Sequence, residues 1–174
     1  HVPGIFGDPD RVVRFEDVLC CPKITCEYNT GRRNKVKLGE KVLVWGDHYA
    51  AVDTVQYLAS IGKQVTVVTE NPAFASKVEV IHMYVARKHF EKKEAEALHY
   101  RSFKYPVKVM EGATVLEVKE GKVLVQDRQF KQIEMEIDSV VTCLQKPDNA
   151  FFFEMKAAGI PVVNIGDSVS PRNL

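Results

Sequence analysis

The clearest chemical signal in the sequence is a turn of small residues after a short apolar run. The run is Lys41–Trp45, and the turn reads Gly46-Asp47-His48-Tyr49-Ala50-Ala51. In a dinucleotide-binding turn the first glycine makes the tight turn, the second lets the backbone approach a pyrophosphate, and the third, often alanine, allows close packing of helix on strand. The pyrophosphate then lies on the N–H groups that begin the following helix. Gly46 and Ala51 meet these needs, so the turn indicates a nucleotide site.

His48 stands where the second glycine is expected. An imidazole there occupies the space of a diphosphate, and Asp47 adds negative charge beside an anion site. His48 could instead donate a hydrogen bond to a phosphate in a shifted position. Two interpretations therefore stay open: a working dinucleotide site, and a fold that has kept its shape but lost its ligand.

The position that would bind the ribose is similarly ambiguous. An acidic residue at the end of the second strand would bind the ribose hydroxyls of NAD. Thr69 holds that position and Glu70 follows it, with no arginine to favour NADP. Glu70 could serve NAD or could be a solvated loop acid.

Hydrophobic periodicity and glycines define the elements around the turn. Lys41–Trp45 is typical of a buried parallel strand. A helix is expected from about Tyr49 to Ile61, ending at Gly62, before a second strand at Gln64–Thr69. Strand, turn, helix and strand make the right-handed βαβ unit of a doubly wound sheet.

The rest of the chain predicts a mixture of helices and short strands. Residues 1–38 are rich in Pro and Gly and predict an irregular lead-in with a helical turn at 15–19, and 76–101 are helical in character. Apolar runs at 107–110, 114–118 and 122–126 predict a hairpin turning at Glu120-Gly121, and 137–143 predict a buried strand. A helix from Phe151 should end at Gly159, before a last strand at Pro161–Ile165. The predicted fold is α/β, a Rossmann-like doubly wound parallel sheet with an added β-hairpin or meander.

Composition excludes several classes of function. The chain is 45% hydrophobic and 27% charged, with a formal net charge of +1, so no overall field attracts nucleic acid or a membrane. No apolar run approaches the ~18 residues of a membrane-spanning helix. The start does not resemble a signal peptide. A reducing cytoplasm is therefore the expected location, and neither nucleic acid nor membrane is an expected partner.

Other candidate sites have weaker support. The cysteines are Cys20, Cys21, Cys26 and Cys143, and their spacing matches no common metal-ligand pattern. His82, His89 and His99 lack the spacing of a helical zinc pair. No nucleophile elbow is present, and no cysteine has an evident base. We expect no metal site and no catalytic residue in this chain.

Three separated segments resemble the C-terminal region of the Old Yellow Enzyme-like multidomain flavoproteins, of the 2,4-dienoyl-CoA reductase, trimethylamine dehydrogenase and histamine dehydrogenase type. They are Val2-Pro3-Gly4 with Asp17-Val18-Leu19, then Lys41–Val68, and finally Gly166-Asp167-Ser168-Val169-Ser170-Pro171-Arg172-Asn173. Ala51–Leu58 is similar to the dienoyl-CoA reductase helix, whereas Asp47-His48-Tyr49 is similar to the amine dehydrogenases.

The resemblance implies a fragment with three parts. Residues 1–38 would be the lead-in and linker from an FAD- or ADP-binding domain, 39–147 the NAD(P)H-binding-type Rossmann domain, and 148–174 the return segment. Cofactor contacts would come from Gly46, Asp47, His48, Tyr49, Ala50, Thr69 and Glu70, and from Gly166 and Asp167 near the flavin or ADP diphosphate. Gln145 replaces a glycine that the family usually carries close to the cofactor.

The resemblance also implies the function. In the intact enzyme the domain would deliver hydride from NAD(P)H to a flavin, and FMN, FAD or ADP and a 4Fe-4S cluster would lie in the missing part. The partner would be the remainder of the polypeptide, and the fragment would not be active alone, although it could form a homodimer. The alternative is a degenerate module that binds no dinucleotide, as in the amine dehydrogenases.

Overall fold

The computed structural model describes residues 6–7, 11–19, 36–76, 78–90, 103–144 and 148–169. The chain forms two compact units, His1–Cys143 and Leu144–Leu174. The predicted return segment from residue 148 lies inside the second unit. Each unit is described by itself.

The first unit is built on a five-stranded parallel sheet in the order β2-β9-β3-β4-β5. Its strands are β2 (Val12–Arg14), β3 (Lys41–Trp45), β4 (Gln64–Thr69), β5 (Lys108–Glu111) and β9 (Ser139–Thr142). The chain runs outward from β3 through β4 to β5 and then returns to the other side of β3 as β9. This reversal of direction is the topological switch point of a doubly wound sheet, as the sequence predicted.

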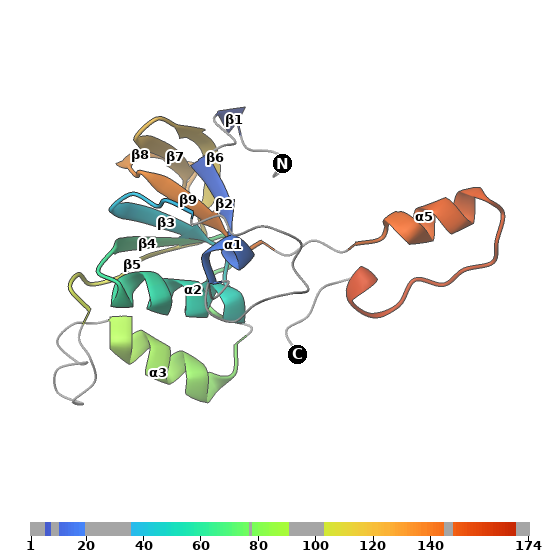
Figure 1. Ribbon diagram of the computed structural model, residues 1–174, viewed down its shortest axis with the longest axis horizontal. Coiled ribbons are helices and arrows are strands. Elements are labelled where there is room, and N and C mark those ends of the chain that lie inside the picture. Colours follow the sequence, from blue (N-terminus) through green and yellow to red (C-terminus); the bar gives the residue numbers. More distant parts are fainter. Residues whose placement is uncertain are drawn as a thin grey trace. The chain divides into compact units, whose positions relative to one another are not determined.

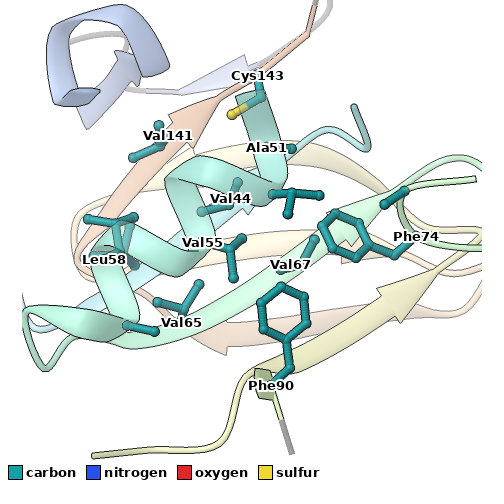
Figure 2. Packing of buried hydrophobic residues seen from close by; sticks show 14 of the residues in the cluster. Val44, Ala51, Val55, Leu58, Val65, Val67, Phe74, Phe90, Val141 and Cys143 are labelled. Atoms are coloured by element: carbon teal, nitrogen blue, oxygen red, sulfur yellow. The ribbon is translucent and has the colours of Figure 1, made fainter. Parts of the chain in front are cut away.

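Helices cover one face of this sheet. They are α1 (Phe15–Leu19), α2 (Tyr49–Ser60) and α3 (Val80–Phe90). Figure 1 shows α2 and α3 on one side of the sheet and strands β6, β7 and β8 on the other. The buried face of α2 includes Ala51, Val55, Leu58 and Ala59, which pack on Val44, Val65 and Val67 of the sheet (Figure 2). The apolar spacing predicted this face correctly.

Gly62 ends α2 in the way that the sequence predicted. Its φ is +84°, and its N–H donates to the carbonyl of Ala59 at 3.1 Å. The N–H of Lys63 donates to the carbonyl of Leu58 at 3.0 Å. This pair of bonds is the Schellman motif, in which a left-handed residue satisfies the last carbonyls of a helix.

A second sheet covers the other face. It holds β6 (Thr114–Lys119), β7 (Lys122–Gln126) and β8 (Gln132–Glu136) as an antiparallel meander, with β1 (Phe6–Gly7) parallel to β6. Leu43 and Trp45 of β3 pack against Val115 and Val123 of the meander. The predicted hairpin at Glu120-Gly121 is confirmed, and β8 extends it to a meander.

Two local predictions were wrong. Residues 1–38 were expected to be irregular, but the described part contains β1 and β2, which pair with strands far along the chain. The second unit contains α5 (Ala150–Ala157) and the 3₁₀ turn η2 (Gly166–Ser168), but the predicted strand at Pro161–Ile165 does not form. A strand needs a neighbour to satisfy its backbone, and this segment pairs with none of the described strands.

Candidate functional site

The predicted nucleotide turn lies at the carboxyl end of β3, where the order of the strands reverses. Gly46 has a φ of +146°, and its N–H donates to the carbonyl of Val68 at 3.1 Å. A Cβ on Gly46 would lie 2.8 Å from the Cβ of Cys143 and 3.1 Å from that residue's carbonyl carbon. The glycine is therefore required by the close approach of the chain that leaves β9, whether or not a ligand binds.

His48 is buried at the start of α2. Only 7% of its surface is exposed, and its ring meets the ring of Phe15 edge-on, with the centroids 6.2 Å apart. Its carbonyl accepts the N–H groups of Ala51 and Val52, at 2.9 and 3.1 Å, and so begins the helix. The imidazole thus packs against α1 of this chain at the position where the turn was expected to leave room for a diphosphate.

Asp47 and Asn71 join the ends of β3 and β4. Asp47 is 9% exposed, and its carboxylate accepts a hydrogen bond from the side-chain amide of Asn71. The backbone N–H of Asn71 donates to the hydroxyl of Thr69, a residue that is 2% exposed, at 3.1 Å. The polar groups of Asp47 and Thr69, both predicted to contact a cofactor, are therefore engaged with Asn71.

Glu70 points toward the meander. Its carboxylate accepts a hydrogen bond from the hydroxyl of Thr114 in β6 at 2.7 Å, and the side chain stays exposed. The contact of Glu70 with a ribose stays a prediction.

Tyr49 and Ala50 make contacts within the first turn of α2 and beyond it. The hydroxyl of Tyr49 accepts the backbone N–H of Glu79 at 3.1 Å, and its ring meets that of His82 edge-on at 5.8 Å. The carbonyl of Ala50 accepts the hydroxyl of Thr54 at 2.6 Å. The ring of His82, from α3, therefore contacts Tyr49 at the start of α2.

Cys143 directly follows β9 and contacts the start of α2. Figure 2 shows it beside the first turn of α2, near Ala51. Its thiol is fully buried and lies 3.7 Å from the hydroxyl oxygen of Thr54. Burial raises the pKa of the thiol to about 12, and the hydrogen bond with Thr54 offsets this only in part. The thiol is therefore protonated at neutral pH and unsuited to act as a nucleophile.

Gly166 and Asp167 belong to the second unit. They form η2, where Gly166 has a φ of +68°. The hydroxyl of Ser168 donates to the side chain of Asn164, and the amide of Asn164 donates to the carbonyl of Ser168 at 3.1 Å. These bonds hold the loop together locally, and the contact of Gly166 and Asp167 with a diphosphate stays a prediction.

Several predicted residues fall outside the described residues: Gln145, Cys20, Cys21, Cys26 and His99. For His89 only the backbone, within α3, is described. Where side chains are described, no three His, Cys, Asp or Glu residues gather as a metal site would need. In the same part of the chain, no helix is long and apolar enough to cross a membrane.

Sequence reasoning missed the residues after β4 that contact the turn. Asn71 precedes Pro72, and this Asn-Pro pair is a turn signal that could have drawn attention to it. Glu111, whose carboxylate accepts the N–H of Phe74 at 2.9 Å, had no local signal, because this contact depends on β5 lying next to β4.

No family model and no curated protein sequence matches this chain. Solved structures do match. The 2-naphthoyl-CoA reductase, in complex with 2-naphthoyl-CoA, has 25% identity and a TM-score of 0.64 over 99% of this chain and 23% of that one. Histamine dehydrogenase from Rhizobium sp. 4-9 has 18% identity and a TM-score of 0.60 over 99% and 25%. The HOCl-induced flavoprotein disulfide reductase of Escherichia coli has 17% identity and a TM-score of 0.57 over 94% and 31%.

At 18% and 17% identity, the similarities to histamine dehydrogenase and to the flavoprotein disulfide reductase show the fold alone. The chain spans about a quarter of the length of the first and second structures, 23% and 25%. The neighbours are flavin oxidoreductases, and they include members of the family that the sequence motifs indicated. The predicted resemblance is confirmed: over nearly its whole length the chain is similar in structure to members of the Old Yellow Enzyme-like multidomain flavoproteins, 2-naphthoyl-CoA reductase and histamine dehydrogenase.

Proposed function

We propose that this chain is the pyridine-nucleotide-binding-type domain of an Old Yellow Enzyme-like NAD(P)H:flavin oxidoreductase. The observation that carries the proposal is the unit β3–Gly46–α2–β4, which stands at the switch point where doubly wound sheets bind dinucleotides. The flavin oxidoreductases among the structural neighbours support it.

In the intact enzyme such a domain delivers hydride from NAD(P)H to a flavin, and the flavin carries the redox chemistry. FMN, FAD or ADP and a 4Fe-4S cluster would belong to the remainder of the polypeptide, which is the proposed partner. Ala50, Glu70 and the start of α2 would face the dinucleotide, and Gly166 and Asp167 the flavin or ADP diphosphate. We propose a cytoplasmic location and no activity for the fragment alone.

A second candidate is a degenerate module that holds domains together without binding a dinucleotide. The specific observation that favours it is the bridge from Asn71 to Asp47, with His48 packed on Phe15 beside it. These contacts fill polar and steric positions that a dinucleotide would need. This second candidate keeps the nucleotide-type fold and lacks a working dinucleotide site.

Calorimetric titration with NADH and NADPH tests whether the turn after β3 binds a dinucleotide. Because His48 and Asp47 crowd the expected phosphate path, we expect a dissociation constant on the order of 1 mM or weaker for both ligands. ADP serves as the control for the adenosine half alone. Micromolar binding of NADH or NADPH would contradict the degenerate module.

A further inference from the structure

The segment after β4 contacts the nucleotide turn near both of its ends. We call residues 70–76, 78 and 79 the strap, since they connect β4 to α3. Near its start, the amide of Asn71 donates to Asp47 in the turn. At its end, the N–H of Glu79 donates to the hydroxyl of Tyr49 in the first turn of α2 at 3.1 Å.

The middle of the strap is fixed to the rest of the unit. The carbonyl of Asn71 accepts the N–H of Gly112 at 2.9 Å, and the N–H of Phe74 donates to the carboxylate of Glu111, also at 2.9 Å. Phe74 is 2% exposed, and its ring lies 6.0 Å from that of Phe90 in the main core (Figure 2). The strap is therefore a packed part of the domain.

One residue of the strap holds an unfavourable backbone conformation. Ala75 is buried and has a φ of +56°. A non-glycine residue in this region is strained and persists only where its surroundings determine it. The neighbouring contacts of Phe74 supply that determination. The strap is thus held in place by interactions at its two ends and in its middle.

The position of the Asn71 contact matters because β3 and β4 are adjacent parallel strands. A dinucleotide on such a sheet places its pyrophosphate at the turn after the first strand and its ribose at the end of the second. The bridge between Asp47 and Asn71 joins these same two places. The bridge therefore spans the two places that a dinucleotide would contact.

We propose that the strap is an internal latch that closes the dinucleotide crevice, and that Asn71 and Tyr49 hold it shut. The inference rests on the proposed function, because it takes the ligand to be an adenine dinucleotide. Breaking the two latch contacts lowers the cost of opening. A site that binds only when open then gains affinity by the factor by which its open fraction rises.

The test combines hydrogen exchange with ligand titration on the full chain. The double variant Asn71→Ala with Tyr49→Phe removes both latch contacts and adds no charge. Tyr57→Phe is the matched control, because Tyr57 lies on the same helix and is 45% exposed. We expect faster amide exchange in the strap of the double variant and unchanged exchange in β3 and β9. NADH affinity should rise about tenfold or more in the double variant and stay unchanged in the control.

The outcomes separate the latch from the proposed function. Unchanged amide exchange in the strap of a folded double variant would overturn the latch. The latch would also be overturned if exchange in the strap became faster without a change in NADH affinity, while the triple variant, which adds His48→Gly to the double variant, restored binding. If the strap opens and neither the double nor the triple variant binds NADH or ADP, the proposed function as a dinucleotide-binding domain is contradicted as well. Tight binding by the unaltered chain with full strap protection would retain the proposed function and refute the latch.

Discussion

At the scale of single residues, Gly46 satisfies a packing requirement that does not depend on a ligand. The sequence placed it as the first glycine of a nucleotide turn, and its φ of +146° agrees with that role. The structure adds a second reason, since the backbone and side chain of Cys143 leave no room for a Cβ. A glycine at this position is therefore compatible with both the working and the degenerate interpretation of the site.

Gly46→Ala should lower the free energy of unfolding by about 3 kcal/mol, because it adds a steric clash to an unfavourable φ. Gly121→Ala is the matched control: Gly121 also has a positive φ, +69°, but a Cβ there meets nothing within 4 Å. We expect the control to lose about 1 kcal/mol from the backbone alone. Urea unfolding of both variants measures the difference. Equal losses would show that contact with Cys143 does not constrain Gly46.

At the scale of elements, local patterns predicted the parts of the fold that depend on nearby residues. The β3–α2–β4 unit was readable because its apolar spacing, its turn glycine and its cap at Gly62 lie within one short stretch. β1 and β2 were missed because each is short and gains its partner only through β6 or β9, far along the chain. The strap was missed for the same reason. The turn residues of the site were therefore predictable, and the residues that cover them were not.

The hairpin between β7 and β8 carries a residue that its local geometry disfavours. Phe130 has a φ of +61° and is 81% exposed, so no packing in this unit compensates its conformation. The carboxylate of Asp127 accepts the N–H groups of Gln129 and Lys131, at 2.8 and 2.9 Å, and fixes the turn. A left-handed position in such a turn is normally taken by glycine.

Phe130→Gly should therefore raise the free energy of unfolding by about 0.5–1 kcal/mol, since it relieves the conformation and loses little burial. Phe130→Ala keeps the disfavoured φ and should lie within about 0.5 kcal/mol of the unaltered chain. Thermal or urea unfolding compares the three proteins. A destabilised glycine variant would indicate that the ring contributes a contact in solution.

At the scale of the whole chain, the two units differ in what they bury. The buried hydrophobic residues of the described structure all lie between Val42 and Cys143, in the first unit. None of the residues 148–169 in the second unit is buried. Burial of apolar surface is the main favourable contribution to folding, so the first unit carries the stability and the second unit needs a covering surface.

The second unit displays apolar side chains that a soluble monomer rarely leaves together in water. Phe151, Phe153, Val163 and Ile165 are 68%, 56%, 82% and 75% exposed. In the proposed intact enzyme the remainder of the polypeptide would cover them. For this chain alone we expect association between copies through the second unit, which is the homodimer that the sequence suggested.

Truncation after Cys143 tests this division of roles. Because the core lies within the first unit, the shortened chain should keep its free energy of unfolding within about 0.5 kcal/mol and should sediment as a monomer. The full chain should show a sedimentation coefficient that rises with concentration. The double variant Val163→Lys with Ile165→Lys keeps the length but places charges at the two most exposed of these four apolar side chains, so it should sediment like the truncated chain. A full chain that stays monomeric at every concentration, or a truncated chain that still associates, would place the contact elsewhere. A marked loss of stability on truncation would instead show that the second unit supports the core of the first.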